Sequence, residues 1–321
     1  MAPREGVADT SLEERSARRA GVLYAVLAYG AWGVVPLFWK QLERLDALEI
    51  LAHRVFWSLV FVGAALVAAR RGKKALEALR SRKQMSYLVL SGALIAGNWG
   101  LFIWAVLQHR LLEASLGYFM NPLVNVVLGV VLLRERLRRA QSIGVLLGLS
   151  GLVVMLVATS SPVWVALSLA SSFAVYGYLR KVAPVESLVG LFVETLLISP
   201  AALFVLVSRE VAGTGLLSRG DVGLYPWAIM AGPVTAVPLA MFAAAARRLP
   251  LSVLGFFQYL APSLQFLLAI TVFGEQVEPA RFAAFGLIWL ALVVVSLDAA
   301  RQKQRSMARA RGSLADKVAT S

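Results

Sequence analysis

The sequence predicts an all-α membrane protein in which ten transmembrane helices form two inverted five-helix repeats. Hydrophobic residues make up 59% of the 321 residues and charged residues 16%. Soluble domains contain about 45–50% apolar and about 25% charged residues, so this chain is too apolar for water. The apolar residues are distributed over many stretches, and a shift of 140 residues aligns prolines and polar residues of the two halves.

Apolar stretches of about 20 residues can cross a hydrocarbon layer roughly 30 Å thick as helices, because a helix satisfies its own backbone polar groups. The predicted spans are 21–40, 48–69, 86–107, 112–133, 141–159, 162–180, 187–207, 224–246, 251–273 and 281–298. Residues 21–159 form the first five-helix repeat and residues 160–300 the second. We expect a polar cytoplasmic N-tail at 1–20, without a signal-peptide core, and a basic cytoplasmic C-tail at 301–321.

The distribution of the 32 Lys and Arg residues predicts the orientation. Most lie in the two tails and in the loops after the even-numbered spans, including Arg180 and Lys181 after span six. By the positive-inside rule, both termini are cytoplasmic in a multi-pass protein of the plasma membrane, the inner membrane of a bacterium. We interpret the basic clusters at 70–74 and 134–139 as orientation signals, and the basic tail as a contact for anionic lipid. The opposite side holds few cations: Lys40, Arg44, Arg110, Arg209, Arg219 and Arg281.

The internal repeat rests on special residues, because apolar helices resemble one another by composition alone. The shift of 140 residues pairs Pro122 with Pro262 and Glu135 with Glu275, while a shift of 141 sets His53 opposite Glu194 and Trp32 opposite Phe173. We interpret Glu135 and Glu275 as partners in ion pairs at helix ends. An odd number of spans in each half requires the second half to enter the membrane from the opposite side. Inverted repeats of this kind are a common basis of alternating access.

Charged residues inside spans are costly and usually face the protein interior or a wet cavity. Arg54 and His53 lie within span two, and Glu194 lies within span seven. One interpretation is that Arg54 attracts an anionic group or pairs with Glu194, while His53 or Glu194 carries a proton during transport. The alternative is a structural polar bridge, or an arginine that extends to the membrane surface.

Polar residues and prolines recur along spans four and nine. Tyr118, Asn121 and Asn125 share one face of span four by their spacing, and span nine repeats the arrangement. We expect both helices to line a cavity, although polar contacts between helices would give the same pattern. The predicted substrate pathway comprises His53, Arg54, Asn98, Trp99, Tyr118, Asn121, Asn125, Glu194, Gln258 and Gln265, and the predicted helix hinges are Pro122, Pro238 and Pro262.

Several function classes are disfavoured by the residues present. The chain has no cysteine, which excludes disulfides, thiol catalysis and cysteine metal sites. It contains no zinc-protease, serine-hydrolase or phosphate-loop motif, so we expect no catalytic residues, no metal and no cofactor. The net charge of +14 is not accompanied by a nucleic-acid-binding motif. A secondary transporter, or permease, is the favoured class, with a channel as the alternative and an integral-membrane enzyme as a weaker one.

Five segments carry a family resemblance. The segment from Glu113 to Gly129, EASLGYFMNPLVNVVLG, closely resembles a signature of RarD proteins, which are EamA-type members of the drug/metabolite transporter superfamily. Residues 32–40, 47–59, 98–106 and 249–269 agree, so the resemblance covers about residues 20–300. It implies ten helices in two inverted repeats around a central cavity and permeation of a small solute. Gln108, His109 and Arg110 depart from the usual small turn between spans three and four.

Overall fold

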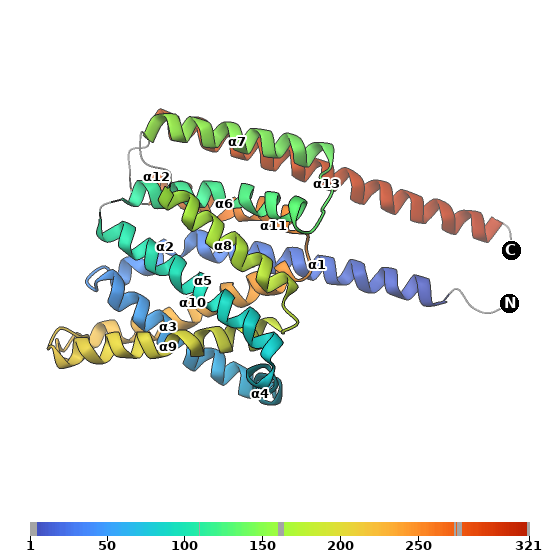
Figure 1. Cartoon of the computed structure of the whole chain (residues 1–321). Coiled ribbons are helices and arrows are strands. Elements are labelled where there is room, and N and C mark those ends of the chain that lie inside the picture. Colours follow the sequence, from blue (N-terminus) through green and yellow to red (C-terminus); the bar gives the residue numbers. More distant parts are fainter. Residues whose placement is uncertain (1–4, 109, 160–163, 273, 275–277, 320–321) are drawn as a thin grey trace. The chain divides into compact units, whose positions relative to one another are not determined.

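The computed structural model describes residues 5–108, 110–159, 164–272, 274 and 278–319, and every regular element among them is a helix (Figure 1). The chain divides into two compact units. Unit 1 comprises Met1–Arg134 and Pro162–Glu275, and unit 2 comprises Glu135–Ser161 and Gln276–Ser321. Each unit is built from segments that are distant in the sequence, so neither unit coincides with one predicted repeat.

In its described residues, unit 1 holds eleven α-helices and two short 3-10 helices. Their bounds are α1 Glu5–Val34, α2 Pro36–Trp39, η1 Lys40–Leu42, α3 Ala47–Ala68, α4 Gly72–Arg80, α5 Arg82–Leu107, α6 Leu111–Val131, α8 Trp164–Val182, α9 Ser187–Val211, η2 Val222–Leu224, α10 Tyr225–Ala246, α11 Leu251–Gln258 and α12 Leu260–Thr271. Unit 2 pairs α7, Arg139–Thr159, with α13, Pro279–Ala319.

Each of the ten predicted spans overlaps a helix, but not all of these helices are equally apolar. In the part of the chain that is described, eight helices are long and apolar enough to cross a membrane, and the apolar part of α6, Leu116–Val131, is shorter. Helix α8 is not among them; three serines, Arg180 and Lys181 make it more polar. The structure therefore supports a multi-pass helical protein, and the count of ten spans stays a prediction.

Local sequence explains where several helices begin and end. The Asp46 carboxylate accepts hydrogen bonds of 3.0 Å from the backbone N–H groups of Leu48 and Glu49, and so caps the first turn of α3. The predicted span 251–273 is divided at Tyr259 into α11 and α12. Pro262 explains this break, because it has no N–H for the carbonyl of Gln258 and its ring crowds that carbonyl.

The predicted polar tails are helical wherever the backbone is described. Helix α1 begins at Glu5 rather than near residue 21, and α13 continues to Ala319 beyond the predicted end at 298. Both extensions are rich in Glu, Arg, Lys, Gln and Ala, which have high helix propensity. The apolar pattern located the membrane-like part of each helix and could not locate the end of the helix itself.

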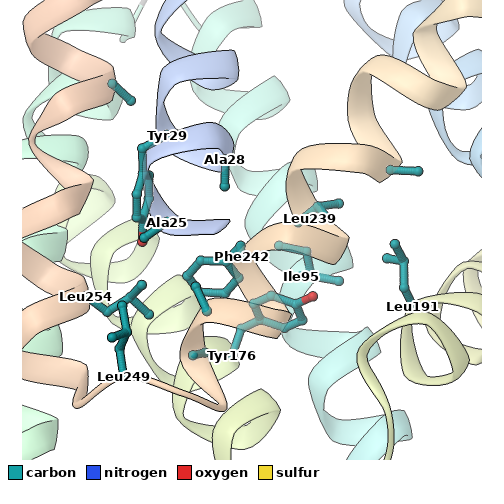
Figure 2. Packing of buried hydrophobic residues seen from close by; sticks show 14 of the residues in the cluster. Ala25, Ala28, Tyr29, Ile95, Tyr176, Leu191, Leu239, Phe242, Leu249 and Leu254 are labelled. Carbon is teal, nitrogen blue, oxygen red and sulfur yellow. The ribbon is translucent and has the colours of Figure 1, made fainter. Parts of the chain in front are cut away.

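Helices from the two predicted repeats contact each other extensively in unit 1. Helix α3 packs against α9 and α10, α6 packs against α8 and α11, α1 packs against α10 and α12, and α5 packs against α8 and α9. A buried cluster lies among these helices and includes Tyr29, Tyr176 and Phe242, which Figure 2 shows close together. The Tyr176 and Phe242 rings are stacked, with centroids 6.0 Å apart.

Candidate functional site

A cavity of about 490 Å³ lies between helices of unit 1. This volume is within the usual range of roughly 300–1,000 Å³ for small-molecule sites. Its walls come from both predicted repeats, and aromatic side chains form much of them. The lining residues are Tyr29, Trp32, Val35, Pro36, Trp39, Ala47, Ile50, Leu51, Arg54, Asn98, Trp99, Phe102, Gly117, Tyr118, Asn121, Leu169, Phe173, Val234, Thr235, Leu239, Gln258, Ala261, Pro262 and Gln265.

Arg54 is the only charged residue in this wall, as far as the structure describes it. It is the eighth residue of α3, about two turns from the helix start, and its Nε donates a 3.0 Å hydrogen bond to Oγ1 of Thr235. The guanidinium carbon lies 4.8 Å from the ring centre of Trp39 and 5.3 Å from that of Trp99. Both distances are within the range of a cation–π interaction. Among the described residues, no carboxylate lies within 4.0 Å of this guanidinium.

Side-chain amides form the second polar feature of the cavity. Asn125 is fully buried behind the wall, and its Nδ2 donates to Oδ1 of Asn121 at 3.0 Å and to Oε1 of Gln258 at 2.8 Å. Asn98 Nδ2 donates to Leu169 O at 2.9 Å, and Gln265 Nε2 donates to Trp32 O at 2.9 Å. These bonds fix the orientation of the amides, and all but the Asn125–Asn121 bond join helices of the two predicted repeats.

An aromatic layer bounds the cavity on one side. Tyr29, Trp32 and Phe173 line the cavity, and their rings contact that of Phe242, which is fully buried. Figure 2 shows Tyr29 and Phe242 of this group. The ring centres of Trp32 and Phe173 are 6.0 Å apart. The sequence aligns these two positions in the repeat, but it did not indicate that they line the cavity. Tyr176 stacks on Phe242, and its hydroxyl donates a hydrogen bond to Glu194.

Glu194 lies behind this aromatic layer and is not part of the cavity wall. Its Oε1 lies 3.4 Å from Nη1 of Arg180, and each side chain is only 1% exposed. The hydroxyls of Ser91 and Tyr176 also donate to this carboxylate. The suggested Arg54–Glu194 pair is therefore wrong in this structure, because Arg180 is the partner of Glu194.

Arg180 does not lie in a loop after span six, where the sequence analysis counted it. Its side chain is buried rather than placed in a loop, and Nη2 donates to Ser187 O at 2.9 Å. Gly190 makes this possible, because a Cβ at this position would lie 1.9 Å from Nη1 of Arg180. The sequence signal for the Arg180–Glu194 pair was Gly190, one turn before Glu194. Glycine is common in membrane helices, so this position could not be distinguished from other glycines.

The structure places seven predicted pathway residues in the wall, and the other three are not part of it. Arg54, Asn98, Trp99, Tyr118, Asn121, Gln258 and Gln265 line the cavity, whereas His53, Asn125 and Glu194 do not. His53 is buried, and neither ring nitrogen has a hydrogen-bond partner among the described residues. The wall residues that sequence reasoning missed include Trp32, Trp39, Phe173 and Thr235. Their roles in binding stay predictions.

The three predicted hinge prolines differ in their local structure. Pro262 lines the cavity and follows the break between α11 and α12. Pro122 and Pro238 lie inside the continuous helices α6 and α10. Two residues of the sequence analysis lie outside those that the structure describes. They are Glu275, predicted to form an ion pair at a helix end, and His109, in the unusual turn between spans three and four.

Ion pairs join α3 and α9 at both of their ends. Asp46 pairs with Arg209 at 2.9 Å, and Arg71 pairs with Glu186 at 3.0 Å. Glu186 also accepts from Lys74, and this hydrogen bond lowers the pKa of Glu186. The basic residues near 70–74, interpreted as orientation signals, therefore also bind another segment of the chain.

The apolar helices and the cavity define a polytopic membrane protein with an internal site of small-molecule size. The EamA-like transporter family matches residues 19–157. Protein RarD of Streptomyces exfoliatus is 43% identical, with 93% of this chain and 95% of the relative covered. Protein RarD of Salmonella typhi is 45% identical, with 88% and 96% covered. A solved crystal structure shares the fold, with a TM-score of 0.67 and 24% identity over 90% of this chain and 99% of that one. The chain therefore belongs to the RarD proteins of the EamA-like transporter family.

Proposed function

We propose that this protein is a secondary transporter that moves a small metabolite or drug-like solute across the cell membrane by alternating access. In this proposal, the ten predicted spans form two inverted five-helix repeats and both termini are cytoplasmic. The observation that carries the proposal is the cavity of about 490 Å³ with an aromatic layer behind it. A carrier needs an internal site that a solute can occupy between the two halves, and this cavity has walls from both predicted repeats.

The helix contacts support the two-fold relation between the halves. In the predicted repeats, α1 corresponds to α8 and α5 corresponds to α10. The contact of α1 with α10 therefore corresponds to that of α8 with α5, and both contacts are present. The same correspondence relates α6–α8 to α12–α1, and α3–α10 to α9–α5. A two-fold arrangement of this kind allows the two halves to exchange conformations, which opens the site first to one side and then to the other.

The ion pairs of α3 and α9 are candidates for the contacts that change in this cycle. Asp46–Arg209 and Arg71–Glu186 lie at opposite ends of the same antiparallel helix pair. In our proposal, the α3–α9 contact opens at one end while it stays closed at the other. Exposed ion pairs contribute only about 0–1 kcal/mol, so they can open and re-form during a cycle.

Proton coupling forms a separate part of the proposal. Glu194 is enclosed with Arg180, whereas His53 is a buried imidazole without a described hydrogen-bond partner. His53 is therefore the better candidate for a proton carrier, as histidine changes charge near neutral pH. Transport rates in proteoliposomes should then depend on an imposed pH gradient, and the dependence should be absent in His53→Gln. Equal rates with and without the gradient would remove proton coupling from the proposal.

The absence of native cysteine allows alternating access to be tested without a known substrate. Cysteine pairs at positions 46 and 209, and separately at 71 and 186, would carry spin labels for distance measurements in lipid nanodiscs. A carrier is expected to give a long distance at one end while the other end remains short, and a cross-link at one end should favour opening of the other. Long distances at both ends in the same molecules would indicate a channel and contradict the proposal.

Solute movement needs a second measurement. Proteoliposomes would be preloaded with members of a panel of unlabelled metabolites and drugs, and uptake of the labelled compounds would be followed. A carrier is expected to show saturable counterflow with at least one compound. Linear, non-saturating fluxes that do not respond to preloading would contradict a carrier.

A further inference from the structure

We infer that Arg54 binds the carboxylate of a monoanionic solute whose remaining part is apolar or aromatic and packs against the tryptophans of the cavity. This inference rests on the proposed transport function and names the class of substrate for the same cavity. It depends on the free edge of one guanidinium, on the charge of the cavity wall and on the aromatic residues around it.

The contacts of the guanidinium leave one edge for a ligand. Its Nε edge donates to Thr235, and the rings of Trp39 and Trp99 lie within cation–π distance of its central carbon. Among the described residues, no acceptor bonds either Nη group of Arg54, and neither Nη is sealed from the cavity. Two parallel N–H groups in one plane match the two oxygens of a carboxylate, which is the geometry of a bidentate pair.

The charge of the wall excludes other classes of solute. A solute with two or more negative charges would meet only one cation in the described wall, so a single negative charge fits best. A zwitterion or a cation would need a carboxylate for its ammonium group, but no Asp or Glu belongs to the described wall. Glu194, the acid that the sequence placed in the substrate pathway, is enclosed with Arg180 and does not line the cavity. The described wall therefore offers no carboxylate to the ammonium group of a zwitterionic solute.

The remaining wall determines the body of the solute. Trp32, Trp39, Trp99, Phe102 and Phe173 line the cavity, so a planar apolar group can pack against rings on several sides. A cation in the interior of a membrane protein without a counter-ion is costly, and a bound carboxylate would remove this cost while the solute is in the site. An aromatic carboxylate such as phenylacetate therefore matches both the charge and the surface of the cavity.

The test measures thermal unfolding of the purified full-length protein with four probes of similar size. These probes are phenylacetate, phenylacetamide, phenethylamine and benzenesulfonate. A ligand that binds the folded state raises the unfolding midpoint. Phenylacetate is expected to raise it at millimolar concentration, while the neutral amide and the amine do not. Benzenesulfonate distinguishes a planar carboxylate from a tetrahedral anion and is expected to bind more weakly.

Variants of Arg54 assign the effect to this residue. Arg54→Gln is expected to weaken phenylacetate binding roughly ten- to a hundredfold, because charge-assisted hydrogen bonds are lost. Arg54→Lys keeps the charge but loses the two parallel N–H groups, so its affinity for phenylacetate should lie between those of the parent and Arg54→Gln. Arg44→Gln removes an exposed arginine outside the cavity and should bind like the parent. Folding of each variant is checked by its elution profile and by its midpoint without ligand.

The outcomes separate this inference from the proposed transport function. Equal stabilisation by phenylacetate and phenylacetamide, or unchanged phenylacetate binding in a folded Arg54→Gln variant, would overturn the carboxylate assignment. Saturable counterflow of neutral solutes would then still support a carrier. Phenylacetate binding that depends on Arg54, without counterflow of any solute, would support the site and contradict the transport function.

Discussion

Replacing Glu194 by Gln should destabilise the protein strongly, because it leaves the buried guanidinium of Arg180 without a counter-charge. Both side chains are 1% exposed, and the closest charged atoms are 3.4 Å apart. Removing one partner of a buried ion pair costs about 3–5 kcal/mol, whereas exposed pairs contribute about 0–1 kcal/mol. Because 1 kcal/mol shifts the midpoint of a domain of 150–250 residues by roughly 2–4 °C, the expected decrease is on the order of 10 °C.

The matched control is Glu186→Gln, which removes a carboxylate from an exposed pair at the end of the same helix. Glu186 is 40% exposed and Arg71 is 43% exposed, so this variant should unfold within a few degrees of the parent. Both variants would be measured by thermal unfolding in the same detergent. A Glu194→Gln midpoint as close to the parent as that of the control would refute the reasoning.

A double variant tests whether the lost stability comes from the unpaired charge. Arg180→Leu combined with Glu194→Gln removes both charges, and buried pairs replaced by apolar residues are often neutral in stability. The double variant is therefore expected to be more stable than Glu194→Gln alone.

Below its midpoint, Glu194→Gln should also transport at the parent rate per folded molecule, because Glu194 does not line the cavity. A stable Glu194→Gln variant that does not transport would instead indicate that Glu194 belongs to the substrate pathway.

Two further predictions concern helix packing and pH. Gly232→Ala would place a Cβ 2.4 Å from the backbone carbon of Trp57 at the α3–α10 crossing, so we expect a cost of about 1–3 kcal/mol in thermal unfolding. Gly30→Ala, where a Cβ meets nothing within 4 Å, is the control, and equal midpoints for the two variants would contradict the close approach. Lys74 and the neighbouring arginines lower the pKa of Glu186 from its ordinary value of 4.5, so its ion pairs stabilise the fold above that value. This contribution to the free energy of unfolding should be lost as the pH falls through the lowered pKa. In thermal unfolding, Glu186→Gln should therefore lose less stability in acid than the parent protein. An equal loss in the two proteins would contradict these ion pairs.

Hydrophobic patterning located most helices, because a membrane helix must be apolar along its length whatever it packs against. All ten predicted spans overlap helices. The helical extensions of the first and last spans into the polar tails were not predicted, because polar residues of high helix propensity continue a helix without any apolar signal. Prolines gave mixed information: Pro262 follows a break in its helix, while Pro122 lies in a helix that continues through it.

Polar residues inside apolar segments indicated the cavity, because such residues are costly in lipid and therefore face the interior. This reasoning found Arg54, Asn98, Asn121, Gln258 and Gln265, all of which line the cavity. Apart from Trp99 and Tyr118, the sequence did not identify the aromatic wall, because Trp32 and Phe173 look the same in sequence whether they face lipid, another helix or a cavity. Trp39 was likewise not distinguished from a tryptophan at the membrane interface.

The sequence by itself determined that this chain is a multi-pass helical membrane protein, which family it belongs to, and which polar residues lie within its apolar segments. These properties depend on composition, periodicity and short motifs, all of which are local in the chain. Only the tertiary structure decided which charged group pairs with which. Arg54 and Glu194 are equally unusual in sequence, but Arg180 reaches Glu194 across the space left by Gly190, and Arg54 remains without a described carboxylate in the cavity wall. Ion pairing depends on distances of a few ångströms between helices, and spacing along the chain does not specify them.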